Sequence, residues 1–446
     1  MTVELLKSPV LIAVALLLIL SVIRLNVVFS LIIAAIVGGL AAGMNGPDIM
    51  TAFSSGLKGG ANIAFNYAML GAFSIAISRS GVTELLAAKL FKFIGREVTP
   101  KQLFLFKYLL LLILTLAAVS SQNVIPIHIA FIPILIPPLL PVFERLKLDR
   151  RMVACILTFG LITPYMVLPA GFGRIYLNEI LIGGLNSNGL KVTPAMAPEA
   201  MLIPALGMAA GLLIAIFFSY RKPREYILEK TLVVIDDPVE IRPRKVIAGF
   251  IAIAVGLAGQ LWMDSLVIAS LLGILVFVLA RVISLRDTQD VFTRGVYMMG
   301  GIGIIMIAAA GFASVMKATG SVETLVQLVS AGIGNQRGLA VFLMLLIGLI
   351  ITMGIGSSFS TVPLIAAIYT PLCIKLGISP LATIAIVGVA GALGDAGSPV
   401  SESVLGPTAG LNADGQHDHI YDSTIPTFIH FNIPLLIAGW IAGMVL

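Results

Sequence analysis

Apolar runs long enough to cross a lipid bilayer recur along the whole sequence. A membrane-spanning helix needs about 20 consecutive apolar residues. Charged residues make up 11% of the 446 residues, against about 25% in a soluble domain, which excludes a water-soluble enzyme, a coiled coil and a disordered chain. The sequence therefore predicts an all-α polytopic membrane protein. The expected spans are 9–23, 27–43, 58–79, 197–219, 246–262, 266–283, 297–317 and 428–446.

Four further apolar stretches are interrupted by polar residues, prolines or glycines. The stretches 102–143 and 338–376 are each broken near the middle by serines, and we expect each to be a hairpin that enters and leaves the membrane on one side. The stretches 151–184 and 380–411 are broken by Pro and Gly, which predicts two helices interrupted within the membrane. Interrupted backbone is tolerated at that depth only where it lines a cavity or is buried in protein.

The distribution of positive charge predicts the orientation of the chain. With both hairpins returning to their own side, 21 of the 28 lysines and arginines fall on one side, 6 fall on the other, and Arg174 stays within the membrane. Positive residues gather in cytoplasmic loops, so the polar linker 221–245 is expected to be cytoplasmic and both termini outside. Since these basic residues lie in short loops, the net charge of +6 does not indicate a nucleic-acid partner.

The two halves of the chain resemble each other, which predicts an internal repeat of residues 1–220 and 246–446. Each half has five crossings in this topology, so the second copy is inserted upside down. Inverted repeats with interrupted helices are the architecture of secondary transporters, with the hairpin 102–143 opening inward and the hairpin 338–376 opening outward. An offset of 239 superposes Asp48, Phe53, Gly56, Phe73, Gly81 and Glu84 on Asp287, Phe292, Gly295, Phe312, Gly320 and Glu323, and an offset of 237 superposes Ser120, Ser121, Asn123 and Pro126 on Ser357, Ser358, Ser360 and Pro363.

Three segments of the sequence resemble the NhaC-type Na+/H+ antiporter family of the ion transporter superfamily, and the resemblance covers nearly the whole chain. They are Arg24-Leu25-Asn26-Val27, Ser120-Ser121-Gln122-Asn123-Val124-Ile125-Pro126 and Gly394-Asp395-Ala396-Gly397-Ser398-Pro399-Val400-Ser401-Glu402. The resemblance implies a homodimer with a scaffold domain, a mobile transport domain that contains the hairpins, elevator-like movement, and sodium bound at the hairpin tips. The branch also includes amino-acid carriers, so the substrate stays open.

Asp395 is the leading candidate for ion coupling. Ionisable groups at membrane depth are costly and mark functional sites. Burial favours the protonated form of a carboxyl group and a bound cation favours the ionised form, so one carboxyl group can exchange H+ for Na+. Alternatively, Asp395 caps the end of an unwound helix. Glu402, seven residues further on, is either a second coupling residue or a group at the cytoplasmic mouth.

Serine-rich breaks predict two sodium half-sites, because hard cations prefer oxygen ligands. The first would combine Ser120, Ser121 and Asn123 with the break near Thr163–Gly171. The second would combine Ser357, Ser358, Ser360 and Thr361 with the break at Asp395–Pro399. Ser398 and Ser401 are further candidates for the substrate or ion pathway. The alternative is that these side chains only hydrogen-bond the hairpin tips to neighbouring helices.

Several other polar residues have two open interpretations. Arg174 either binds a substrate carboxylate or pairs with Glu179. Asn62 and Asn66 either line the substrate path or join helices by hydrogen bonds. His128 is either a packing residue or part of a proton relay. The tract His417-Asp418-His419 resembles a metal site, but we assign it to a solvated loop.

The sequence predicts an ion-coupled secondary transporter of a bacterial inner membrane, without a cofactor other than Na+ as coupling or transported ion. Na+/H+ antiport is the leading hypothesis, and Na+- or H+-coupled amino-acid symport is the alternative. The pairs Gly394-Asp395 and Tyr421-Asp422 resemble the motifs of intramembrane aspartyl proteases. That hydrolase is a remote alternative, because Asp422 falls in a polar loop, and we do not expect an enzyme.

Overall fold

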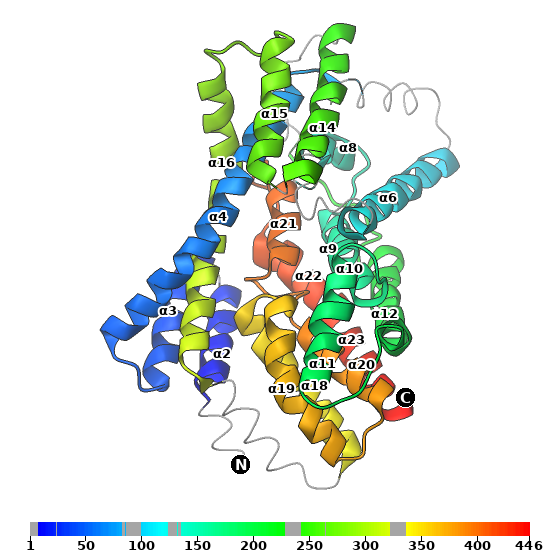
Figure 1. The fold of residues 1–446 in the computed structure, drawn as a ribbon. Coiled ribbons are helices and arrows are strands. Elements are labelled where there is room, and N and C mark those ends of the chain that lie inside the picture. The colour runs from blue at the N-terminus through cyan, green and yellow to red at the C-terminus, as the bar shows by residue number, and fades with distance from the viewer. Residues whose placement is uncertain are drawn as a thin grey trace.

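The computed structural model describes residues 8–23, 25–82, 100–123, 135–227, 242–263, 265–321 and 336–446, together with residues 85 and 132. Every regular element in these residues is a helix (Figure 1). Seven of the helices are long and apolar enough to cross a membrane. Large apolar side chains such as Phe218, Trp262 and Leu279 are exposed on the outside of the bundle, as expected where the solvent is lipid.

The described residues of the first half of the chain contain six long helices and several short ones. Asn45 and Asp149 cap α4 and α9 by accepting hydrogen bonds from backbone N–H groups near the helix starts, which is the usual use of these residue types. The helices are α2 (Pro9–Val22), α3 (Val27–Ala41), α4 (Gly46–Ser78), α6 (Pro100–Asn123), η2 (Pro137–Leu139), α8 (Leu140–Arg145), α9 (Arg150–Val167), α10 (Phe172–Arg174), η3 (Ile175–Ile182), α11 (Gly183–Ser187), α12 (Met196–Ile214) and η4 (Ala215–Ser219).

The second half repeats a similar order of elements. Its final span, His419–Val445, runs continuously through α-helical and π-helical turns. The helices are α14 (Pro243–Met263), α15 (Leu266–Leu279), α16 (Thr288–Ala318), α18 (Arg337–Ile355), α19 (Ser358–Lys375), α20 (Pro380–Ala392), α21 (Glu402–Leu411), η5 (His419–Thr424), α22 (Ile425–Thr427), η6 (Phe428–Asn432) and α23 (Ile433–Val445).

Three helices begin earlier than their apolar runs predict. α4 begins at Gly46 rather than 58, α16 at Thr288 rather than 297, and the last span at His419 rather than 428. Each extension is polar, with Asp48 and Asp290 in the first turns of α4 and α16. Acidic residues there suit the positive end of a helix dipole, so hydropathy alone misses the starts of these helices.

α4 and α16 cross each other with their backbones in contact (Figure 1). A Cβ atom on Gly56 would meet the backbone of Ala310, and one on Gly295 would meet the backbone of Gly71 and Ala72. The two helices are therefore antiparallel. Adding 239 to a residue number in α4 gives the matching position in α16, so Gly56 matches Gly295 and Gly71 matches Ala310. The contact of Gly56 with Ala310 therefore has its counterpart in the contact of Gly295 with Gly71, and Ala64 contacts its own matching residue, Gly303. Such reciprocity is what a two-fold relation between the halves requires.

α18 and α19 form an antiparallel helical hairpin whose open end lies beside the C-terminus. Arg337, at the start of α18, donates to the carbonyl oxygen of Gly443, and Ser379, just after α19, donates to that of Leu446. α20 packs between the arms, since Gly348 of α18 contacts Ala390 and Gly391 contacts Val362 of α19. α20 is buried from Ala382 to Ala392, which places it at the centre of the larger core.

Candidate functional site

The chain between α20 and α21 is unwound over residues 393–401. Gly394 and Gly397 have φ angles of 87° and 79°, a region that glycine enters without the steric cost of a Cβ atom. A Cβ atom on Gly394 would lie 2.7 Å from the carbonyl oxygen of Leu349. Asn432 completes the turn: its Oδ1 accepts a 3.0 Å hydrogen bond from Gly394 N, and its Nδ2 donates to the carbonyl oxygen of Ala396.

Four helix ends meet beside the unwound segment. α18 ends just before Gly356, whose φ of 74° turns the chain into α19 at the hairpin tip. α20 ends at Ala392, and α21 begins after its N-cap Ser401. A Cβ atom on Gly356 would lie 2.9 Å from Cγ2 of Val400, so the tip touches the unwound segment. Helix ends of both polarities therefore adjoin one site, an arrangement that attracts ions.

The carboxyl group of Asp395 lies at this junction, and the residue is 5% exposed. Tyr165 of α9 donates a 2.8 Å hydrogen bond to Oδ2, and Ser358 donates one of 2.9 Å to the same oxygen. Ser401 donates a short hydrogen bond to Oδ1. Hydroxyl groups from α9, α19 and the N-cap of α21 thus provide the hydrogen bonds that the carboxylate loses when it is buried away from water.

Three of these oxygens form a closed ring, because the Tyr165 and Ser358 hydroxyl oxygens are also 2.8 Å apart. Three contacts need three hydrogens, and the two hydroxyl groups supply only two. A proton on Asp395 would supply the third. A hard cation, which prefers oxygen ligands, would bind the same three oxygens in place of that proton.

Asp395 lines one cavity, and a second cavity shares Gly356, Ser357 and Glu402 with it. The site cavity has a volume of about 90 Å³, and the crossing cavity, of about 400 Å³, lies between the hairpin tip and the crossing of α4 and α16. The tip and Glu402 are therefore the wall between the two. The site cavity is lined by Leu161, Tyr165, Gly356, Ser357, Ser358, Phe359, Asp395, Glu402 and Ser403. The crossing cavity is lined by Ser55, Gly56, Gly59, Ala309, Ala310, Ala313, Ser314, Lys317, Ile355, Gly356, Ser357, Val400 and Glu402.

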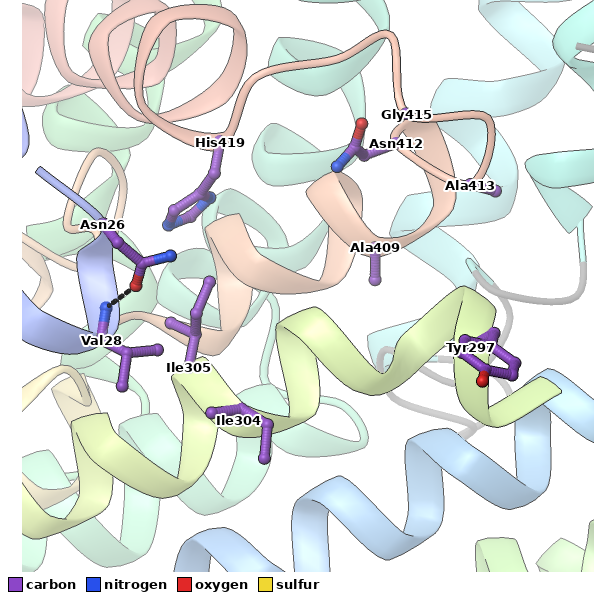
Figure 2. A pocket seen from close by; sticks show the side chains of 10 residues that line it. All are labelled: Asn26, Val28, Tyr297, Ile304, Ile305, Ala409, Asn412, Ala413, Gly415 and His419. Carbon is purple, nitrogen blue, oxygen red and sulfur yellow. Dashed lines mark hydrogen bonds between the residues drawn. The ribbon is translucent and has the colours of Figure 1, made fainter. Parts of the chain in front are cut away.

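A third cavity lies between the start of α3, the middle of α16 and the end of α21, and Figure 2 shows it from close by. Its volume is about 570 Å³, and we term it the Asn26 cavity. α21 therefore has the crossing cavity at its first residue and the Asn26 cavity near its last turn. The lining residues are Asn26, Val28, Tyr297, Ile304, Ile305, Ala409, Asn412, Ala413, Gly415 and His419.

The residues expected in the second sodium half-site and the pathway candidate Ser401 fall near Asp395, but they do not all offer a free oxygen. Ser358 and Ser401 contact the carboxylate, and Ser357 lines the site cavity. Thr361 donates to the carbonyl oxygen of Ser357 at 2.8 Å, and Ser398 donates to that of Met353 at 3.2 Å. These last two hydroxyl groups stabilise the tip and the unwound segment in this conformation.

Among the described residues expected in the first half-site, the hydroxyl groups of Ser121 and Thr163 have partners other than an ion site. Ser121 donates to the carbonyl oxygen of Ala118 in its own helix at 2.7 Å, Ser120 is half-buried, and the Thr163 hydroxyl lies 3.5 Å from the sulfur of Met208. His128 and the side chains of Asn123 and Ser360 lie outside the described residues.

Three predicted pathway residues on other helices, Asn62, Asn66 and Arg174, are not among the residues that line the site cavity with Asp395. Arg174 and Glu179 are both exposed, and no ion pair joins them in the described part of the chain. Glu179 therefore does not hold Arg174 in this conformation, and the binding of a substrate carboxylate by Arg174 stays a prediction. Asn62 is exposed and Asn66 half-buried on α4, and neither lines any of the three cavities.

The sequence motifs do not reveal two residues of the site, Tyr165 and Asn432. Tyr165 of α9 bonds the Asp395 carboxylate, and Asn432 of the last span bonds the unwound segment. The only local signal for Tyr165 is its place in Thr163-Pro164-Tyr165, just before the first broken helix ends. The assignment of His417 and His419 to a solvated loop is wrong, since they are 1% and 8% exposed. Asp418 between them is exposed and accepts hydrogen bonds from the backbone of Ile420 and Tyr421, so the turn buries the two imidazole rings.

Helices that break around a buried carboxyl group are typical of secondary transporters, and that is the class of membrane protein which this fold and site define. Residues 156–440 match the Na+/H+ antiporter family, and residues 8–94 match a further Na+-H+ antiporter family. The chain belongs to the Na+/H+ antiporter family, which confirms the NhaC-type resemblance of its motifs.

Relatives of high identity span the full length of the chain. A membrane protein of Vibrio parahaemolyticus is 57% identical over 440 residues, which cover 98% of this chain and 100% of the relative. The Bacillus subtilis protein YuiF, whose name designates it a candidate amino acid transporter, is 46% identical over 446 residues, with 98% and 100% covered. The YdaH transporter of Alcanivorax borkumensis is similar at a TM-score of 0.41 and 16% identity, over 89% of this chain and 88% of that one.

Proposed function

We propose that this protein is a Na+/H+ antiporter in which Asp395 binds Na+ and H+ in turn. The observation that carries the proposal is the ring formed by Asp395 Oδ2, Tyr165 Oη and Ser358 Oγ, whose three contacts share two hydroxyl hydrogens. Either a proton or a sodium ion can supply the further positive charge that the three oxygens of the ring need. Because Na+ and H+ compete for the same oxygens, the site carries only one of them across the membrane at a time. Carrying the two ions alternately in opposite directions exchanges Na+ for H+.

The two loaded forms differ in how the carboxyl group is satisfied. In the proton form, Asp395 donates within the ring and accepts from Ser401. In the sodium form, the ionised carboxylate and the neighbouring hydroxyl oxygens bind the cation, with Ser357 within reach across the site cavity. Both forms neutralise the carboxylate, which removes much of the cost of moving it through a membrane.

We further propose that the protein works by an elevator-like movement, as a homodimer, in the inner membrane, with the inverted-repeat topology expected from the sequence. The reciprocal contacts of α4 and α16 support the inverted repeat. Their backbone-to-backbone packing also suits a fixed scaffold. The hairpin of α18 and α19, which packs on α20 and touches the unwound segment at Val400, suits the moving part. The crossing cavity and the Asn26 cavity lie at opposite ends of α21 and supply the two approaches to the site.

A second candidate function is Na+- or H+-coupled amino-acid symport. The designation of YuiF as a candidate amino acid transporter, at 46% identity, favours it. The crossing cavity of about 400 Å³ also falls in the size range of small-molecule sites. In this alternative the amino acid occupies the crossing cavity, with Asp395 and the coupling ion behind the hairpin tip.

Transport by reconstituted full-length protein tests the proposal. In proteoliposomes with an internal pH dye, an imposed Na+ gradient should drive protons the opposite way. Asp395→Asn keeps the shape but removes the exchangeable charge, so Na+-driven proton flux and labelled-Na+ uptake should both disappear. The matched control is Asp48→Asn, which changes an exposed carboxylate at the start of α4 and should leave both fluxes unchanged.

Labelled amino acids in a parallel set of vesicles separate the two candidate functions. Uptake of an amino acid that depends on Na+ or H+ would support symport and contradict simple antiport. Proton flux retained by a stable Asp395→Asn variant would show that Asp395 is not the coupling residue, and Glu402 would then be the next residue to replace.

A further inference from the structure

A continuous chain of hydrogen bonds links two buried histidines near the end of α21. His417 Nε2 lies 2.8 Å from Ser423 Oγ, Ser423 Oγ lies 2.8 Å from Thr408 Oγ1, and Thr408 Oγ1 lies 2.9 Å from His419 Nδ1. All four residues are buried. The chain ends where His419 Nε2 meets the carbonyl oxygen of Pro399, at 2.9 Å, in the unwound segment that contains Asp395.

The outer end of this series of hydrogen bonds is His417, which has one ring nitrogen without a partner in the described residues. His417 Nδ1 is buried and makes no hydrogen bond in the described residues. Residue 417 belongs to the loop 412–418, and this loop packs against the first residues of the linker, where Gln416 bonds the backbone of Ile227 and Arg224 lies 2.6 Å from Asp422. Since the linker is the segment expected in the cytoplasm, the His417 end of the chain faces that side.

The chain can be polarised in two directions. The Pro399 carbonyl oxygen only accepts, so His419 Nε2 carries a hydrogen in either case. With both rings neutral, a continuous chain requires Thr408 to donate to His419 Nδ1, Ser423 to donate to Thr408, and His417 Nε2 to donate to Ser423. In the structure Thr408 is instead the donor to Ser423, and its hydroxyl oxygen also lies 2.9 Å from the carbonyl oxygen of Val404. The Thr408 hydroxyl group therefore has to rotate before a proton can pass. When His419 carries an extra proton, every hydrogen bond of the neutral chain reverses, with Thr408 donating to Ser423.

Charged groups of both signs surround the outer histidine. Burial lowers the pKa of His417 to about 3, with Asp422 opposing that shift and Arg150, Arg224 and His419 adding to it. Asp414 is held by Arg150 at 2.6 Å, and Asp418 faces His419. The resting chain is therefore neutral, and it holds a proton only while the proton passes.

We propose that His417, Ser423, Thr408 and His419 form a proton relay from the cytoplasmic loop 412–418 to the unwound segment 393–401. A proton that reaches His417 Nδ1 releases the Nε2 proton to Ser423, which passes its own to Thr408, which passes its own to His419 Nδ1. One proton enters, one ends on His419, and no charge is left on either hydroxyl group. Delivery to Asp395 then requires His419 Nε2 to leave the Pro399 carbonyl oxygen, so that contact acts as the gate.

The position of His419 supports this role. Its imidazole lines the Asn26 cavity, and Figure 2 shows the ring directed into it beside Asn26 and Ile305. The ring therefore has space beside it to turn once the bond to Pro399 breaks. The relay rests on the proposed function, because it supplies protons to the Asp395 site.

The test uses the full-length protein in proteoliposomes and two readouts. Na+-driven proton flux needs the relay, whereas exchange of labelled Na+ for unlabelled Na+ needs only the ion site. Thr408→Val removes a hydroxyl group at constant shape, and His417→Gln removes the shuttling ring. Each should lower proton flux about 100-fold, the usual weight of a positioned acid–base group, and should leave Na+/Na+ exchange within about two-fold.

Two matched variants outside the chain are the controls. Thr427→Val changes another buried threonine, which bonds backbone carbonyl oxygens, and His430→Gln changes another buried histidine, bonded to Ser219 and to the Pro426 carbonyl oxygen. Both should retain proton flux. If Thr408→Val and His417→Gln keep wild-type proton flux, the relay is overturned. If the wild-type protein itself moves no protons against Na+, the proposed antiport fails as well, and the two failures are thus told apart.

Discussion

Ser358 and Ser121 occupy matching places in the two predicted half-sites, but their hydroxyl groups have different partners. Ser358 donates to Asp395, whereas Ser121 donates to a carbonyl oxygen of its own helix. The motif around each serine is similar in sequence. What separates them is the carboxyl group of Asp395, which reaches Ser358 from 37 positions away along the chain.

This difference gives a prediction for sodium binding. Ser358→Ala removes a hydrogen-bond donor and a potential ion ligand, and should weaken the apparent Na+ affinity by about ten-fold, the value of one hydrogen bond to a charged group. Ser121→Ala is the matched control and should leave the affinity nearly unchanged. Titration of labelled-Na+ uptake in proteoliposomes measures both. Equal effects of the two changes would contradict the asymmetry of the half-sites.

The chemistry of the site could be predicted at residue level only where one short motif contains it. Asp395, Ser398, Ser401 and Glu402 lie in one motif, and the polar break around them is evident in the sequence. Tyr165 could not be predicted, because its hydroxyl meets Asp395 across 230 positions. The burial of His417 and His419 could not be predicted either, because their rings are held by Thr408, Ser423 and the Pro399 carbonyl oxygen, which the tract His417-Asp418-His419 does not contain.

The crossing of α4 and α16 depends on small residues at the scale of the helix. Gly56 and Gly295 are in contact with the backbone of the facing helix, whereas a Cβ atom on Gly59 or Gly300 would meet open space. A side chain at the first two positions must therefore push the helices apart. Close backbone approach through glycine is a common way to pack helices within membranes.

The stability of the crossing can be measured with these pairs. Gly56→Ala and Gly295→Ala should each destabilise the protein by about 1–3 kcal/mol through overpacking. Gly59→Ala and Gly300→Ala should be neutral or slightly stabilising, because Ala has the higher helix propensity. Thermal unfolding in detergent compares the four variants. A smaller loss for Gly56→Ala than for Gly59→Ala would show that the crossing is not tightly packed.

The all-helical fold and the positions of most helices could be predicted from the apolar runs, but the first residues of α4 and α16 could not. Both first turns are polar: Asn45 caps α4 and accepts a hydrogen bond from Asp48 N, and α16 carries Asp290 in its first turn. The hairpin of α18 and α19 was recognisable from its serine break. That α20 packs between its arms follows from contacts over a range of about 40 positions, which local patterns do not contain.

At the scale of the whole molecule, the inverted topology makes a prediction about sidedness. Lys222, in the linker, should be accessible from the cytoplasm, and Lys375, at the open end of the hairpin, from the other side. Both side chains are exposed, and the two native cysteines are buried, so single cysteines introduced at 222 and 375 can be labelled over a low background. Labelling of both from the same side, with an impermeant thiol reagent on intact cells, would contradict the inverted repeat.

The wall between the site cavity and the crossing cavity includes Gly356, Ser357 and Glu402, which line both cavities. Stoichiometric exchange needs this wall to stay shut whenever the other approach is open. A defect in it would create a passive leak, through which each escaping ion would dissipate about 2.3 kcal/mol per 100 mV of membrane potential. The tightness of a single glycine turn therefore decides whether the molecule conserves the energy of a gradient or wastes it as a channel.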